Sequence, residues 1–332
     1  MSYVQLANKL HAAGDKAQYD ACAKNLLSEK IILAWILKYC TDEFKNYDIS
    51  RIVQCIETPR VSETPVHQNT SEQIDNESIV GLNTEDKPID EAKIVYDILF
   101  HAWVPDTKRS VRLWVNIEAQ KDANPGYSLL KRGIYYCGRL LSQQYGKNVQ
   151  KIRYNDVEKV YSIWICETKT GERTNTINKY TITEESVLGN FRDEQENYDL
   201  LTVVMVGLDT NHKHINVGSE KSDSEKLIGM LSTLLSSVKK SNEKLNILEQ
   251  TYDIHTSDKF KQEVSVMCNL SHNIEARGEQ NGIQLANARN LSALMKNANL
   301  SLIEAMKMLG IDQAEYERYE DFIKQLQSEN NE

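Results

Sequence analysis

The alternation of apolar and polar positions is clearest in the middle of the chain, where it predicts two neighbouring β-strands. Residues 93–103 (KIVYDILFHAW) and 111–120 (VRLWVNIEAQ) both alternate, and the short polar run PDTKRS connects them. Successive side chains of a strand point to opposite faces, and a short polar connection favours a hairpin, so the two segments are expected to pair in antiparallel fashion. Residues 160–166 and 200–208 are largely apolar and predict two further strands, the second of them buried.

Apolar residues at helical spacing flank these strands. The pattern predicts one helix over residues 19–40 and another over residues 127–146, with Gly146 as its C-terminal stop. The expected apolar stripes are Leu26, Leu27, Ile31, Ala34, Trp35 and Leu37 in the first helix, and Leu130, Ile134, Cys137 and Leu141 in the second. Residues 58–78 are polar, contain two prolines and indicate a linker or insertion, after which IVGLNTE predicts a short strand.

Helical patterns dominate from about residue 222 onward. SEKLIGMLSTLLSSVKK is amphipathic, residues 241–250 are expected to continue in a helix, and IEARGEQNGIQLANARNLSALMKNA predicts one long helix. Two shorter helices should follow, broken at Gly310, with Asp312 as a cap for the second. The order of elements therefore predicts an α/β core over residues 1–211 and an all-helical region over residues 212–332.

The composition favours a cytoplasmic protein without a membrane partner. The N-terminal segment is polar and lacks the apolar core of a signal peptide, and the longest strongly apolar run, residues 31–37, is far shorter than the roughly 20 residues that span a bilayer. The six cysteines are scattered without a CxxC pair, which favours free thiols in a reducing compartment. His212 and His214 form an HxH in a polar segment, which is most simply a solvated loop.

Positive charge is concentrated in the middle of the chain. The net charge is −9, yet residues 91–160 carry 12 Lys and Arg against 7 Asp and Glu. A basic segment on an otherwise acidic protein is typical of a DNA-contacting surface, although a merely solvated basic face would give the same count.

Two carboxylates share one predicted face of the hairpin. Asp97 is a lone acid among the apolar residues of 94–102, and Glu118 lies on the polar face of 111–120. Burying a carboxylate is unfavourable unless a partner or a metal compensates its charge, and carboxylate pairs bind hard cations such as Mg²⁺. The alternative is an ordinary amphipathic strand whose polar face meets water.

The helix that follows carries basic and polar side chains at helical intervals. Arg132, Tyr136, Arg139 and Gln143 recur at a spacing that favours a shared side, and residues 121–155 hold seven Lys or Arg against a single acid. Arginine can bind phosphate through two hydrogen bonds, and tyrosine can stack on a base or donate its hydroxyl. The pattern favours phosphate binding over a solvated basic face.

In this order and spacing, the motifs resemble the PD-(D/E)XK nuclease family transposases, also called recombination-promoting nucleases, over roughly residues 15–210. The resemblance rests on IVYDILFHA, VNIEAQKDANPGYSLLKRGIYYCGRLLSQQYG and VYSIWIC. It implies a restriction-endonuclease-like mixed sheet flanked by helices. It also implies cleavage of DNA in recombination or transposition with Mg²⁺, or Mn²⁺ in its place.

The resemblance also implies roles for individual residues. Asp97 and Glu118 match the two motif carboxylates, the carbonyl of Ala119 would be a further metal ligand, and Glu29 would be a supporting acid from the first helix. The residues expected to contact DNA are Arg132 and Tyr136, which match an R-x-x-x-Y pattern, together with Arg139 and Lys131.

Gln120 departs from the superfamily pattern, which has lysine at this position. A lysine there would orient the attacking water and offset the charge that develops on the phosphate, whereas glutamine can hydrogen-bond water but brings no charge. Glutamine is familiar here in the subfamily that the chain resembles. Lys121 and Lys131 are candidate replacements for the missing charge.

A Mg²⁺-dependent DNA endonuclease is therefore the expected function, with Asp97, Glu118 and Gln120 at its catalytic site. Two alternatives remain open. The first is a nuclease fold that binds DNA but has lost cutting, with Gln120 as its best support. The second is an interaction protein in which the helical region 212–332 drives homo-oligomer formation.

Overall fold

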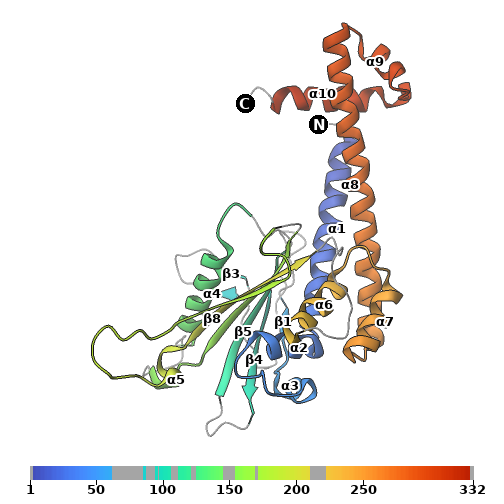
Figure 1. Cartoon of the computed structure of the whole chain (residues 1–332). Helices are drawn as coiled ribbons and strands as arrows, with labels where there is room; N and C mark the ends of the chain where they lie inside the picture. Colours follow the sequence, from blue (N-terminus) through green and yellow to red (C-terminus); the bar gives the residue numbers. More distant parts are fainter. Residues whose placement is uncertain are drawn as a thin grey trace, which may run out of the picture. The chain divides into compact units, whose positions relative to one another are not determined.

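The computed structural model describes residues 3–61, 85–86, 94–95, 97–105, 111–120, 125–144, 154–168, 171–209 and 222–329. The chain divides into two compact units (Figure 1). Residues 20–268 form the sheet unit, and residues 1–19 with 269–332 form the helical unit. This division does not coincide with the boundary predicted at residue 211, because the helices that follow residue 222 begin in the sheet unit.

A mixed β-sheet is the centre of the sheet unit. Its order is β1 (Arg60–Val61), β4 (Ile98–Val104), β5 (Val111–Gln120), β6 (Val160–Thr168), β8 (Leu201–Asp209) and β7 (Thr176–Thr181). Strands β5, β6 and β8 run parallel, and the outer pairs are antiparallel. The predicted hairpin is confirmed, because Ile98 pairs with Ile117 and Val104 with Val111.

Strand β7 is an element that the sequence pattern did not predict. Its side chains are mostly polar and exposed, as an edge strand with one free side permits. A second, two-stranded sheet joins β2 (Glu85–Asp86) to β3 (Ile94–Val95). The predicted linker at 58–78 and the strand IVGLNTE lie largely outside the described residues, as do Lys121, His212 and His214.

Helix α4 (Leu129–Gln143) covers one face of the sheet. Its buried residues are Leu129, Gly133, Tyr136, Cys137 and Leu140, which pack against Leu99, Val160, Trp164, Cys166 and Val203. Of the predicted stripe, Cys137 is buried and Leu130 and Leu141 pack against this cluster, whereas Ile134 was wrong, since it is 46% exposed. Gly133 explains the difference: a Cβ there would lie 2.9 Å from Trp164 Nε1 and 2.8 Å from Val203, so only glycine lets the helix approach this closely. The helix ends at Gln143, and Gly146 lies outside the described residues.

The opposite face of the sheet packs against α3 (Ile49–Cys55) and α6 (Asp223–Leu235), and α2 (Lys30–Cys40) packs against both of these helices. The single helix predicted over 19–40 is in fact two, α1 (Tyr3–Ser28) and α2. The break falls at Glu29, whose backbone is extended (φ −62°, ψ 129°). The hydroxyl of Ser28 donates to the Asn25 carbonyl at 2.7 Å, a local bond that competes with continuation of the helix.

The remaining helices follow the predicted order. They are α7 (Ser241–Tyr252), α8 (Asp258–Ala298), α9 (Leu302–Met308) and α10 (Tyr316–Glu329), whereas the short α5 (Gln195–Tyr198) was not predicted. The predicted break at Gly310 is confirmed by its φ of +67°, and the Asp312 side chain accepts from the Ala314 N–H at 2.9 Å, capping the turn that leads into α10. None of the described helices combines the length and apolarity of a membrane span.

Two glycines of α4 give a matched test of the close approach. We expect Gly133→Ala to lower the free energy of unfolding by about 1–3 kcal/mol, because the added methyl group overpacks against Trp164 and Val203. Gly138→Ala meets nothing within 4 Å and should raise it by about 0.5–1 kcal/mol through the lower backbone entropy of alanine. Urea unfolding of both variants measures the difference, and equal effects would contradict the packing described.

Candidate functional site

Asp97 and Glu118 lie side by side at one end of the β4–β5 pair. The backbone N–H of Asp97 donates to Glu118 Oε1 at 3.1 Å, and the backbone N–H of Ala119 donates to Asp97 Oδ2 at 3.1 Å. The proximity follows from the strand register, since the next pair along is Ile98 opposite Ile117. Each carboxylate is thus fixed by the backbone of the other strand.

The middle of the polar face of β5 is buried. Asn116 is 0% and Glu118 4% exposed. The Asn116 amide donates to Ser162 Oγ at 3.4 Å, and the Trp164 indole donates to the same oxygen at 2.9 Å. The carboxylate pair therefore lies at the end of a buried polar row, where a charge loses most of its hydration.

Burial and mutual repulsion act on both acids. Burial, and after it the negative charge of Asp97, raises the pKa of Glu118 to about 8. Burial also raises the pKa of Asp97, although Lys24 opposes this effect. At neutral pH Glu118 is therefore mostly protonated, because the surroundings do not compensate a second negative charge beside Asp97. Such a pair is the donor set that a hard divalent cation prefers.

Lys24 of α1 provides a cation that the sequence interpretation missed. Its Nζ lies 2.9 Å from Asp97 Oδ1 and 2.8 Å from Asp20 Oδ2, and its side chain is only 9% exposed. Burial alone would lower the pKa of Lys24, but Asp97 and Asp20 together raise it, so the ammonium stays charged. In the sequence, Asp20 and Lys24 look like an ordinary solvent-exposed i, i+4 ion pair of a helix. Nothing in this spacing indicates that Lys24 also pairs with Asp97, which is far away in the chain.

Glu29 stays a predicted supporting acid, because none of the described contacts joins it to Asp97 or Glu118. It lies at the α1–α2 break, close enough to Glu263 for its charge to contribute, after burial, to the raised pKa of that residue. The acid that reaches Asp97 through Lys24 is Asp20.

Arg132 and Tyr136 turn toward the carboxylates. Arg132 donates through Nε to the Tyr136 hydroxyl at 2.9 Å and through Nη1 to the Tyr127 hydroxyl at 2.8 Å. Its guanidinium carbon lies 5.3 Å from the Trp164 ring centre, and its charge lowers the pKa of Glu118 against the larger effect of burial. These two residues therefore line the buried side of α4, while Lys131 is exposed. Gln120 is half-buried and pairs with Cys166 across to β6.

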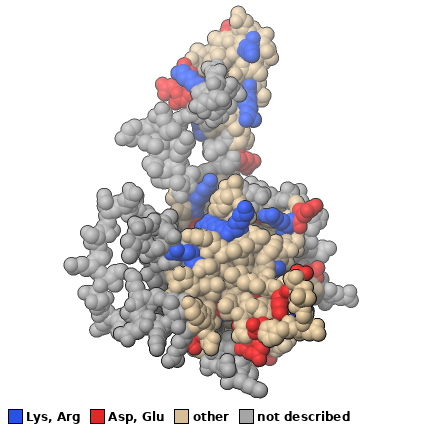
Figure 2. Space-filling model, turned by 90° about the vertical axis from the view of Figure 1, so that its left-hand side faces the viewer, with Lys and Arg blue, Asp and Glu red and all other residues tan. Residues whose placement is uncertain are grey.

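Basic side chains gather on part of the sheet unit. On the face drawn in Figure 2, Lys and Arg lie mostly in the upper half of this unit, and Asp and Glu mostly along its lower part.

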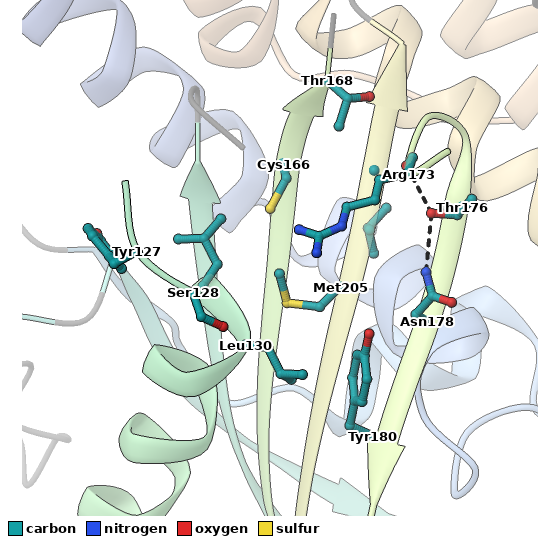
Figure 3. A pocket seen from close by; sticks show the side chains of 13 residues that line it. Tyr127, Ser128, Leu130, Cys166, Thr168, Arg173, Thr176, Asn178, Tyr180 and Met205 are labelled. Carbon is teal, nitrogen blue, oxygen red and sulfur yellow. Dashed lines mark hydrogen bonds between the residues drawn. The ribbon is translucent and has the colours of Figure 1, made fainter. Parts of the chain in front are cut away.

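A cavity of about 250 Å³ lies beside Gln120, where β6, β8 and β7 are covered by the start of α4 (Figure 3). Its lining combines polar and apolar side chains, and Cys166 in its floor is the strand neighbour of Gln120. The residues that line it are Tyr127, Ser128, Leu129, Leu130, Cys166, Thr168, Arg173, Thr176, Asn178, Tyr180, Met205, Val206 and Gly207.

Within the part of the chain that the structure describes, no three His, Cys, Asp or Glu side chains form a metal-binding group. Asp97 and Glu118 contribute only two such side chains to the proposed metal site, which is below this number. Comparisons with protein-family models, with curated proteins and with solved structures found no match for the chain.

The raised pKa of Glu118 predicts that stability falls as pH rises between about 4.5 and 8. In this window the folded protein binds more protons than the unfolded chain, whose glutamate titrates near 4.5. Glu118→Gln removes this component. The difference in free energy of unfolding, variant minus wild type, should therefore increase by on the order of 3–5 kcal/mol as the pH rises from about 4.5 to about 8. Urea unfolding at several pH values measures the gain, and a difference that does not change with pH would contradict the assignment.

Proposed function

We propose that the chain is a metal-dependent DNA endonuclease of the PD-(D/E)XK type. The observation that carries the proposal is the pair Asp97 and Glu118, which are held on adjacent strands, buried, and raised in pKa by burial above all. A mixed sheet with α4 between two parallel strands supports the nuclease-like fold that the sequence resembles.

Asp97 and Glu118 fit one Mg²⁺ or Mn²⁺, with the Ala119 carbonyl as a further ligand and water or phosphate oxygens completing the shell. Such an ion, when bound, polarises a phosphate and lowers the pKa of a coordinated water. Arg132 is held in place by hydrogen bonds to the hydroxyls of Tyr136 and Tyr127, and its positive charge lies near Glu118. The exposed Lys131 and the half-buried Arg139 on α4 would contact the DNA backbone.

Lys24 supplies the positive charge that Gln120 does not. It reaches Asp97 from α1 through a 2.9 Å contact, and its burial keeps the charge unscreened. Of the other candidates, Lys131 is exposed, and Lys121 lies outside the described residues. In this proposal Gln120 hydrogen-bonds the reacting water, and Lys24 offsets negative charge at Asp97.

The second candidate is a nuclease fold that binds DNA without cutting it. The same Lys24 contact favours it, because an internal ammonium already compensates part of the charge that a metal would neutralise. The proposed cellular setting is a cytoplasmic role in recombination or transposition, by resemblance, with self-association through the helical region 212–332.

Charge-neutral variants of the two acids separate these candidates. Asp97→Asn and Glu118→Gln are each expected to lower Mg²⁺-dependent nicking of supercoiled plasmid by at least about 10²-fold, since each removes a ligand of the ion. Asp42→Asn is the matched control, because it removes an exposed carboxylate that pairs with Lys179. Nicking at the wild-type rate in both site variants would overturn the assignment, and an inert wild-type protein would favour the binding-only candidate.

Replacing Lys24 tests its proposed role. Lys24→Met should lower the nicking rate by about 10²-fold, the usual effect of losing one positioned group that stabilises developing charge. Lys159→Met is the control, because Lys159 is also ion-paired and 11% exposed, with Glu43 and Asp199 as partners. Both variants lose stability, so rates are compared below both melting temperatures. A Lys24→Met protein that nicks as fast as the control would remove Lys24 from the site.

A further inference from the structure

The cavity is built from several elements and opens to the surface, with buried residues in its floor and exposed residues such as Tyr127 and Tyr180 at its edge. Its floor is formed by Cys166 of β6 and Met205 of β8, and α4 contributes Leu130. Gly207 allows the turn before β7 to pack against β8, because a Cβ at this position would lie 1.8 Å from the Arg173 carbonyl oxygen. The backbone approach that brings Arg173 to the cavity therefore depends on glycine in β8.

Strand β7 turns a polar face into this cavity. Thr176, Asn178 and Tyr180 alternate along the strand and all line it (Figure 3). The Asn178 amide donates to Thr176 Oγ1 at 3.2 Å, and that hydroxyl donates to the Arg173 carbonyl at 2.9 Å. This short chain of bonds orients the amide, which has more donor and acceptor groups than it uses here.

Arg173 brings a cation to the same cavity. Its guanidinium extends over β6 and β8 between Cys166 and Met205 (Figure 3). No described carboxylate forms an ion pair with it, in contrast to Lys24 and Lys159, which are both paired. An arginine of this kind offers two parallel N–H groups to a phosphate.

Two contacts link the lining of the cavity to the residues around the carboxylate pair. Tyr127 on the rim of the cavity accepts a hydrogen bond from Arg132, whose charge acts on Glu118. Cys166 in the floor of the cavity lies opposite Gln120 in the register of β5 and β6. Gln120 in turn is two residues after Glu118 and lies on the same face of β5. A ligand in the cavity would therefore lie one strand away from Gln120.

We propose that this cavity binds one unpaired nucleotide of a DNA strand. Its base would lie against Tyr180 and the Asn178 amide, and its phosphate on Arg173. The volume, about 250 Å³, is below the range of roughly 300–1,000 Å³ that holds drug-sized ligands, and it suits a single ring system. Aromatic faces and amides are the groups that recognise splayed bases, and enzymes that use such pockets favour unpaired positions. The proposal deepens the proposed nuclease function and rests on it for the identity of the polymer.

Binding to two DNA duplexes tests this proposal. One labelled duplex is fully paired, and the other is identical except for a single bulged nucleotide. Fluorescence anisotropy is measured in EDTA, so that binding is observed without cutting. We expect the full-length protein to bind the bulged duplex roughly 10- to 100-fold more tightly, the range that stacking of one base on an aromatic side chain provides.

Variants of the cavity connect this preference to its residues. Tyr180→Leu and Arg173→Gln should each reduce the preference to about 2-fold or less. Lys179→Gln is the control, because it removes a positive charge from the opposite face of β7 and should leave the preference intact. Equal binding of the two duplexes by wild type, or an unchanged preference in both cavity variants, overturns the proposal.

The outcomes also distinguish this proposal from the nuclease proposal. If wild type shows no preference for the bulge but nicks plasmid with Mg²⁺, the nucleotide cavity is wrong and the nuclease stands. If wild type prefers the bulge but cuts neither duplex with Mg²⁺ or Mn²⁺, the cavity stands and the nuclease proposal fails.

Discussion

Two carboxylates that face each other out of water are the constraint on which the rest of the site depends. Asp97 and Glu118 each bind a backbone N–H of the other's strand, so strand pairing itself forces the two charges together. A buried charge without compensation costs several kcal/mol. The protein compensates Asp97 with the ammonium of Lys24, whereas Glu118 keeps a pKa near 8. A further positive charge, such as a metal ion, would therefore stabilise the ionised form of Glu118.

The packing around the pair maintains this low hydration. Gly133 lets α4 lie directly on Trp164, which helps to bury the middle of the polar face of β5. The same approach places Arg132 where its charge acts on Glu118, and where it can hold Tyr127 at the edge of the cavity. The close packing of α4 therefore affects both the charge at the two acids and the position of Tyr127 at the cavity.

The shared face of Asp97 and Glu118 could be predicted from sequence, because strand alternation has a period of two and a short connection fixes the hairpin. Three of the four predicted stripe residues of α4 do pack against the sheet, but the exposure of Ile134 could not be predicted, because the sheet selects the side that carries Gly133. Lys24 could not be predicted either, because its partner is far away in sequence and buried lysines carry no local signal. Strand β7 escaped prediction because polar edge strands lack the apolar pattern of central ones.

The central claim is that Asp97 and Glu118 hold a divalent cation, and a direct binding measurement tests it without any assumption about DNA. Isothermal titration of the full-length protein with Mn²⁺ should show roughly one ion bound per chain. The double variant Asp97→Asn and Glu118→Gln keeps the shape of both side chains and should bind none at this site. Wild-type protein without saturable binding, or a double variant that binds Mn²⁺ as wild type does, would contradict the account.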